Sequence, residues 1–370
     1  MRTKRLFIIS AINITSGGPG RILNECLENS TKILDKFKLI ALINDKKYIH
    51  KYTELSQKIT FICFPKSNKN WLFRIFYEYI YFFQFSRKFS IDIWLSLHDC
   101  SPFVKSKKQF VYCHNPDIFS KFRFSYLIHD PLFVIRKYLY RFVYLINIKS
   151  NCAVIVQQDW IRKEFFKIFK LKNIIVAKPS IESLTKAKNK INSNNIKTFY
   201  YPSFPRSFKN HEVICNAVEI LENKYKWEGE IIFTIKGNEN KYAKNLWKRF
   251  NHLKTITWVG IQKAKDNYTI FKKVDCLLFP SRLETWGLPI TEAKILDLPI
   301  IVSDLPYAHE TVGDCRKVKF INPDDPKKLA NILFLLTKGK QILNISIAKK
   351  IDNPHTKNWD ELFQIVCNNY

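Results

Sequence analysis

The sequence predicts two doubly wound α/β domains joined by a polar segment. The chain has 370 residues, about twice the length of a typical domain. Short apolar runs alternate with helical segments in both halves, which is typical of parallel sheets covered by helices. Residues 183–196 are polar and break that alternation, as a linker does. We therefore expect an N-terminal domain over 1–185, a linker over 186–196 and a C-terminal domain over 197–354.

The first half begins with an apolar strand, a glycine-rich turn over 15–20 and a helix. Residues 71–85 form a dense aromatic segment, and residues 132–146 form a basic and aromatic helix. Further buried strands are expected at 38–44, 58–64, 91–99, 108–115, 152–158 and 173–179.

The second half repeats the strand–helix alternation. Its expected strands lie at 197–202, 230–237, 255–260, 274–281, 298–304 and 318–322. Pro354 is expected to stop one helix, and residues 358–368 to begin another. This last helix, within 355–370, is expected to pack back on the N-terminal domain.

The composition points to an anionic partner. Lys and Arg number 61 against 32 Asp and Glu, which gives a net charge of +29. Nucleic acid, acidic lipid and a phosphorylated substrate all fit this excess. A genome-wide bias toward Lys, Ile, Asn and Phe explains it equally well. The nine cysteines form no C-x-x-C pattern, so we expect reduced thiols in a cytoplasm, without disulfides or a zinc site. The apolar N-terminus is interrupted at Asn13 and favours a strand over a signal peptide.

The segment PSRLETWGLPITEAK, residues 280–294, carries the clearest chemistry. It follows an apolar strand, and Pro289 stands where a helix takes its first residue. The unpaired N–H groups of such a helix start bind phosphate well, and ligands bind beyond the carboxyl ends of parallel strands. The carboxylates of Glu284 and Glu292 are suited to sugar hydroxyls. The alternative is that both carboxylates are simply solvated. The N–H donors would come from Trp286, Gly287 and Leu288.

This segment resembles the E-x7-E motif of retaining glycosyltransferases with the GT-B fold, in particular glycosyltransferase family 4. The order of Gly237, the TWVG ending at Gly260 and the later DLPIIVSD agrees with that family. The resemblance implies two Rossmann-like domains facing a cleft. It also implies that Glu284 contacts the donor sugar and Glu292 the nucleotide ribose.

A second stretch, YPSFPRSFKNHE, extends over 201–212. The family usually has Gly-Arg and then Lys-Gly here, with both cations on the donor diphosphate. This chain has Arg206, then Lys209 followed by Asn210, so the arginine is displaced and the glycines are missing. Lys209 is the stronger candidate, because a cation beside the departing diphosphate stabilises developing charge. The alternative is that both are ordinary surface cations.

The N-terminal half offers weaker candidates. Gly18 and Gly20 lie in a glycine-rich turn that borders the cleft in the resembled family. His114 and Asn115 follow a strand and match the position of a family histidine near the sugar or acceptor. A lone histidine is more often structural, and His98 is a lesser contender.

The resemblance implies a retaining hexosyltransferase that moves sugar from a nucleotide sugar to a lipid-linked glycan in bacterial O-antigen, lipopolysaccharide or capsule synthesis. His114, Glu284 and Lys209 would be its catalytic residues, with no metal and no cofactor. We expect a cytoplasmic enzyme, peripheral on the anionic inner face of the membrane. GDP-mannose is one donor candidate beside UDP-hexoses, UDP-N-acetylhexosamines and deoxysugar nucleotides. The alternatives are a basic nucleic-acid-binding protein and a nucleotide-sugar epimerase of the same fold.

Overall fold

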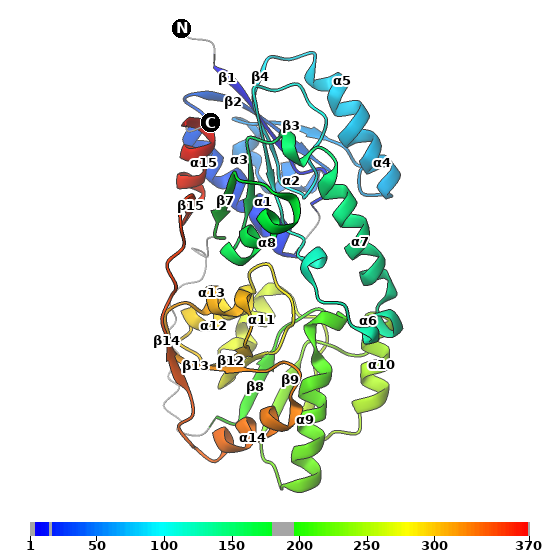
Figure 1. Ribbon diagram of the computed structural model, residues 1–370, viewed down its shortest axis with the longest axis vertical. Helices are drawn as coiled ribbons and strands as arrows, with labels where there is room; N and C mark the ends of the chain where they lie inside the picture. The colour runs from blue at the N-terminus through cyan, green and yellow to red at the C-terminus, as the bar shows by residue number, and fades with distance from the viewer. Residues whose placement is uncertain (1–3, 15–16, 180–195, 369–370) are drawn as a thin grey trace. The chain divides into compact units, whose positions relative to one another are not determined.

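The computed structural model describes residues 4–14, 17–179 and 196–368. The chain divides into two compact units, each an α/β sandwich (Figure 1). Unit 1 comprises residues 1–118, 138–180 and 351–370, and unit 2 comprises residues 119–137 and 181–350. The expected linker, 186–196, lies outside the described residues except for Ile196.

Unit 1 contains an eight-stranded parallel sheet in the order β15-β7-β6-β5-β4-β1-β2-β3. Successive strands spread outward in both directions from the pair β1–β4, so the sheet has its topological switch point there. The strands are β1 (Arg5–Ser10), β2 (Phe37–Ile43), β3 (Thr60–Cys63), β4 (Ile91–Ser96), β5 (Lys108–Tyr112), β6 (Ala153–Val156), β7 (Ile174–Ala177) and β15 (His355–Thr356).

The two faces of this sheet are buried by different helices. Phe7 and Ile9 belong to a core shared with α1 (Gly17–Asn29) and α15 (Trp359–Asn368). Ile8 belongs to a second core together with Phe82 of the aromatic segment. Neighbouring strand residues point to opposite faces, so a strand buried on both sides reads as a continuous apolar run.

Unit 2 contains a seven-stranded sheet in the order β10-β9-β8-β11-β12-β13-β14, parallel except for the last pair. Its switch point lies between β8 and β11. The strands are β8 (Thr198–Tyr201), β9 (Glu230–Phe233), β10 (Ile256–Trp258), β11 (Cys276–Phe279), β12 (Ile300–Ser303), β13 (Cys315–Ile321) and β14 (Asn344–Ser346).

The remaining helices connect these strands. In unit 1 they are α2 (Lys47–Lys51), α3 (Thr53–Ser56), α4 (Trp71–Phe76), the π-helix η2 (Tyr77–Tyr81), α5 (Phe82–Ser86) and α8 (Asp159–Phe169). In unit 2 they are α6 (Phe124–His129), α9 (His211–Lys224), α10 (Lys241–Phe250), α11 (Ala264–Phe271), α12 (Leu288–Ile295), α13 (Pro306–Val312) and α14 (Pro326–Thr337). The long helix α7 (Pro131–Leu145) starts in unit 2 and ends in unit 1.

One domain boundary differs from the expectation. Residues 119–137 were expected within 1–185, but they group with unit 2. The Phe133 ring lies 5.2 Å from that of Phe208, and the guanidinium of Arg123 pairs with Asp324. Aromatic packing and an ion pair therefore attach α6 and the start of α7 to unit 2, a non-local preference that strand–helix alternation does not reveal.

The end of the chain also differs in part. No helix ends at Pro354; β14 and the short β15 occupy this region instead. The last helix, α15, lies in unit 1, where the Trp359 ring stacks at 5.9 Å on Tyr112 and donates a hydrogen bond to Glu25. All nine cysteines are free thiols. Across the described ranges, no helix combines the length and apolar character needed to cross a bilayer.

Candidate functional site

The candidate donor site lies in unit 2, at the switch point of its sheet. Lys209 follows β8 and Glu284 follows β11, and these two strands are neighbours. The Lys209 ammonium lies 2.5 Å from a carboxylate oxygen of Glu284, and the two side chains are only 17% and 11% exposed. Two residues that the sequence marked 75 positions apart are thus in direct contact. Ligands of open α/β sheets bind at this kind of position.

Asn210 fixes the loop that carries Lys209. It adopts the left-handed conformation with φ of 62°, which glycine takes most easily and asparagine next. Its buried amide donates to the carbonyls of Pro280 and Pro323, at 3.1 and 2.7 Å. The hydroxyl of Tyr201 donates to the Lys209 carbonyl. Asn210 thus takes the conformation expected of the family's glycine and adds two hydrogen bonds of its own, a role that the sequence did not reveal.

The loop after Glu284 turns into α12 at Gly287, whose φ is 85°. The helix starts at Leu288, so Pro289 is its second residue, whereas the sequence predicted it to be the first. Trp286 is buried, and its indole donates to the Thr291 hydroxyl at 3.0 Å. The Thr311 hydroxyl donates to the Trp286 carbonyl. Trp286 therefore holds the loop against α12 and α13 with its side chain and carbonyl, and Gly287 and Leu288 stand at the positive end of α12.

Glu292 lies one turn into α12, close enough to Tyr200 of β8 for its charge to act on the Tyr200 hydroxyl. Burial, and after it the charge of the Glu292 carboxylate, raises the pKa of the Tyr200 hydroxyl. That hydroxyl donates to the side chain of Asn267. The Glu292 carboxylate therefore lies near Tyr200 of β8, one of the two strands at the switch point.

Arg206 and Arg282 differ in what they contact. The Arg206 guanidinium lies 5.4 Å from the ring centre of Phe204, and its carbonyl accepts from the Lys209 N–H. Arg282, which the sequence did not single out, donates to Asp324 at 2.8 Å. Partial burial would raise the pKa of Asp324, but hydrogen bonds from Arg123 and Arg282 hold it below its usual value. Arg282 therefore braces two loops instead of reaching outward.

Gly237 and Gly260 both have positive φ, at 92° and 78°. A Cβ on Gly237 would lie 2.6 Å from the Cβ of Trp247, so only glycine fits. The Gly237 N–H donates to the Glu239 carboxylate at 2.9 Å, and the Gly260 N–H donates to Ile235. Both glycines thus shape the ends of β9 and β10, with their N–H groups already engaged.

In unit 1, α1 begins at Gly17, so Gly18 and Gly20 lie in its first turn. The turn residues 15 and 16 lie outside the described part of the chain. Gly20 lines an open hollow of about 320 Å³ together with the cationic side chains of Arg21, Lys47 and Lys51.

His114 is buried and held on both ring nitrogens. Its Nε2 lies 2.6 Å from the Leu97 carbonyl, and its Nδ1 faces the Gln157 amide at 3.5 Å. The carbonyl fixes the proton on Nε2. Burial lowers the pKa of His114, although the Asp99 carboxylate opposes this. His114 is therefore a neutral imidazole whose Nδ1 accepts from Gln157.

Asn115 is anchored by its backbone. A single carboxylate oxygen of Asp99 accepts the N–H groups of His114 and Asn115, at 2.6 and 2.9 Å, and the Tyr144 hydroxyl. Asp99, with φ of 65°, thus organises the loop after β5, which the sequence did not indicate.

Solved structures share this architecture. The lipopolysaccharide outer core galactosyltransferase WaaB aligns with a TM-score of 0.59 and 13% identity, covering 90% of each chain. The protein HepE of Anabaena, solved with UDP-glucose, aligns with a TM-score of 0.58 and 12% identity, covering 90% of this chain and 93% of that one. The chain has the GT-B fold of glycosyltransferases.

The sequence comparisons find similarity to glycosyltransferases. Residues 182–350 match the model of glycosyl transferases group 1. The O-antigen chain mannosyltransferase RfbU of Salmonella typhimurium is 24% identical over 209 residues. That match covers 54% of this chain and 57% of the relative, so the chain spans little more than half of the relative's length.

Proposed function

We propose that the chain is a retaining hexosyltransferase that moves a sugar from a nucleotide sugar to a lipid-linked glycan in bacterial surface polysaccharide synthesis. The observation that carries the proposal is the Lys209–Glu284 pair at the switch point of unit 2. The names of the O-antigen and lipopolysaccharide relatives support the biological setting. The UDP-glucose bound in a structural neighbour supports a nucleotide-sugar donor.

Each residue of the pair has a distinct task in this proposal. The Lys209 ammonium has three N–H donors, and one of them engages Glu284. The others are available to the donor diphosphate, whose negative charge grows as the sugar leaves. The second Glu284 oxygen accepts a sugar hydroxyl, and Glu292 accepts the ribose hydroxyls.

The transfer is proposed to need no metal. Lys209 and the start of α12 would supply the positive charge that a divalent cation supplies elsewhere. The neighbouring carboxylates Asp324 and Asp325 are both engaged: Asp324 pairs with two arginines, and Asp325 accepts from the Lys328 N–H as the cap of α14. These two carboxylates are therefore poorly placed to bind a cation.

Nucleotide sugars are expected to raise the melting temperature. At a concentration of 100 times Kd, the stabilisation is about 2.7 kcal/mol. GDP-, UDP-, dTDP- and CMP-sugars should be compared by scanning fluorimetry. One nucleotide class should stabilise the protein, and Glu292→Ala should lose most of the shift because the ribose contact is gone.

Glu228→Ala is the matched control, since the Glu228 side chain is 70% exposed. It should keep the shift. A shift with RNA and none with any nucleotide sugar would contradict the transferase and favour a nucleic-acid-binding protein. Breakdown of the donor without an acceptor-linked product would favour an epimerase.

The acceptor is proposed to bind in unit 1. The hollow beside Gly20 is lined by three cationic side chains, which suits the phosphates of a lipid carrier. His114 is proposed to border the acceptor, with its neutral ring oriented by the Leu97 carbonyl.

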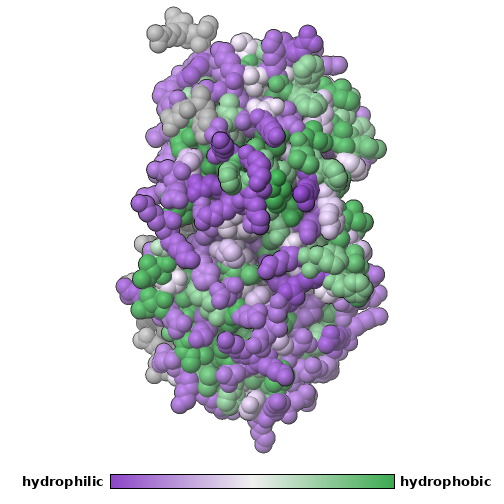
Figure 2. Space-filling model, viewed as in Figure 1, coloured by the Kyte–Doolittle hydropathy of each residue, from purple (hydrophilic) through white to green (hydrophobic). Residues whose placement is uncertain are grey.

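Unit 1 also carries an apolar surface, which we call the aromatic patch. Phe82 of the aromatic segment is core, but its neighbours project outward and are 44–68% exposed. Figure 2 shows apolar side chains gathered where α4 and α5 lie. The patch consists of Trp71, Leu72, Phe76, Ile80 and Phe83, flanked by the exposed cations Lys66, Lys69, Arg87 and Lys88.

Such a surface fits an anionic membrane, because aromatic side chains insert at the interface and cations attract the headgroups. We expect co-sedimentation with phosphatidylglycerol vesicles that weakens as salt rises. Replacing Trp71, Leu72 and Phe76 by Ser should weaken binding by about 10³-fold or more, since each apolar side chain that inserts contributes about 1.5–3 kcal/mol.

The control replaces Ile345 and Ile347 of unit 2 by Ser, since both are at least 75% exposed but lie outside the patch. Equal vesicle binding by both variants, or binding that ignores lipid charge and salt, would contradict membrane docking by the aromatic patch.

A further inference from the structure

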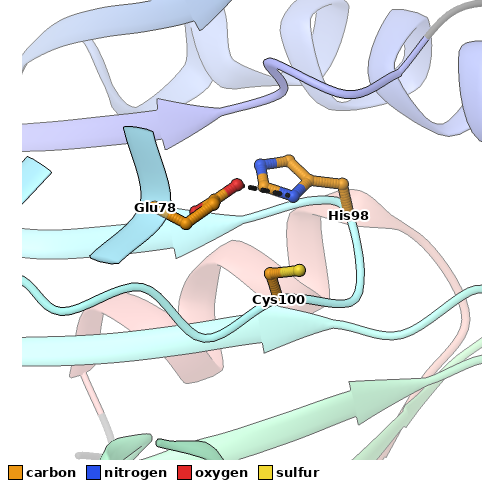
Figure 3. A group of neighbouring side chains, drawn as sticks. All are labelled: Glu78, His98 and Cys100. Atoms are coloured by element: carbon orange, nitrogen blue, oxygen red, sulfur yellow. Dashed lines mark ion pairs between the residues drawn. The ribbon is translucent and has the colours of Figure 1, made fainter. Parts of the chain in front are cut away.

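Three buried side chains converge at the switch point of unit 1. Glu78 comes from the π-helix η2, while His98 and Cys100 follow β4. A carboxylate oxygen, His98 Nδ1 and Cys100 Sγ all lie within 4.8 Å of one another, and the residues are 0%, 2% and 3% exposed. Figure 3 shows the carboxylate pointing at the imidazole with the thiol beside them.

The local backbone produces this convergence. Single turns of π-helix are rare and are frequent at functional sites, and here the π-helix carries Glu78 among three tyrosines and an isoleucine. After β4, Asp99 has φ of 65° and the Cys100 N–H donates to the His98 carbonyl at 2.8 Å. This tight turn brings the side chains of His98 and Cys100 into the same cluster.

The polar atoms of this cluster are poorly satisfied by the protein. Both oxygens of Glu78 and Nδ1 of His98 are buried without a hydrogen-bond partner. A buried polar group without a partner destabilises the fold, so the cluster calls for a ligand that all three residues share.

The geometry points to a divalent metal ion of the zinc type. Oε1 of Glu78 lies 3.3 Å from Nδ1 of His98. Two ligands about 2.0 Å from Zn²⁺ in a tetrahedral site are separated by about this distance. Carboxylate, imidazole and thiolate are all common zinc ligands. We propose that Glu78, His98 and Cys100 bind one Zn²⁺ ion, with water in the fourth position.

The surrounding residues support each ligand. The Ser10 hydroxyl lies 3.2 Å from Nε2 of His98. In the metal-bound tautomer this hydroxyl would accept a hydrogen bond from Nε2–H, which leaves Nδ1 for the metal. Arg74 donates to Sγ of Cys100 at 2.9 Å and to the His98 carbonyl. Cys100 binds as the thiolate after losing its proton, so thiolate and carboxylate together neutralise the ion.

This ion would lie in unit 1 and would tie η2 to the end of β4. The sequence indicated no zinc site because its cysteines show no paired spacing. Here the turn after β4 supplies His98 and Cys100, and the π-helix η2 supplies Glu78.

The test is the metal content of the full chain purified without chelator. Wild-type protein should contain about one zinc per chain. Cys100→Ser and Glu78→Gln should contain at least tenfold less. Cys113→Ser removes another buried cysteine of unit 1 and should keep its zinc.

If these variants fail to fold, a second measurement on wild-type protein still tests the proposal. Wild-type protein reconstituted with Co²⁺ should show thiolate-to-cobalt absorption, and chelator should lower its melting temperature. A wild-type protein that takes up no zinc, or cobalt-loaded protein without that absorption, would overturn the proposal. The cluster would then be a buried polar network held by Arg74 and Ser10 without metal.

Discussion

Replacing Lys209 by Met is expected to slow sugar transfer by about 10²–10³-fold, the usual loss when one preorganised group that stabilises transition-state charge is removed. The ammonium lies against Glu284, at the end of the strand where donor phosphates are expected. Methionine keeps most of the length and apolar contact of the side chain but removes the charge. The measurement is turnover of the nucleotide sugar that gives the largest thermal shift.

The same variant also leaves Glu284 without its partner. Both side chains are less than a fifth exposed, so the single variants should each lose about 1–3 kcal/mol of unfolding free energy. The double variant Lys209→Met with Glu284→Gln should recover part of this stability but no transfer. Recovery of stability without recovery of transfer would show that Lys209 acts in the reaction and not only in holding the loop.

Lys197→Met is the matched control, because Lys197 and its partner Glu228 are about half or more exposed. It should change neither stability nor turnover appreciably. A Lys209→Met enzyme that works within threefold of wild type, or whose turnover recovers in the double variant, would show that the pair only braces the loops.

The sequence predicted the fold because its signals are local. Strands buried on both faces read as apolar runs, and Gly287 and Pro289 mark the start of α12 within a few residues. Glu284 and Lys209 were found through motifs. Their direct contact was not, since it depends on β8 and β11 being neighbours across the switch point.

The residues that the sequence missed act through tertiary contacts. In the sequence Asn210 is an ordinary polar residue, and only the structure shows that its amide joins two other loops. Asp99 receives three donors that lie between 15 and 45 positions away. Residues 119–137 were assigned to the wrong domain because helix periodicity predicts where a helix lies but not what it packs against. That packing depends on the contacts of Phe133 and Arg123 with unit 2.

Lowering the pH from 7 to 5 is expected to destabilise unit 2 through His211. This residue is fully buried at the start of α9, where Nε2 lies 2.8 Å from the Ser203 hydroxyl and Nδ1 faces Tyr242, itself bonded to Glu212. Burial, with a smaller contribution from Lys209, lowers the pKa of His211 to about 3.

An unfolded histidine titrates near 6.5. Between pH 6.5 and 3 the unfolded chain therefore binds a proton at His211 that the folded chain does not. Stability is full above this window and falls as the pH decreases through it, by about 1.4 kcal/mol per pH unit. From pH 7 to 5 the contribution of His211 amounts to a loss of about 2 kcal/mol.

The variant His211→Gln cannot take up this proton, so it should lose about 2 kcal/mol less than wild type between pH 7 and 5, even if it is less stable at pH 7. Amide exchange of β8 and β11 during urea unfolding reports on unit 2 alone. His252→Gln is the control, because that side chain is 58% exposed and pairs loosely with Glu219. If His211→Gln shows the same pH dependence as wild type, as His252→Gln should, the prediction is wrong. His211 would then take up a proton in the folded protein as readily as in the unfolded chain.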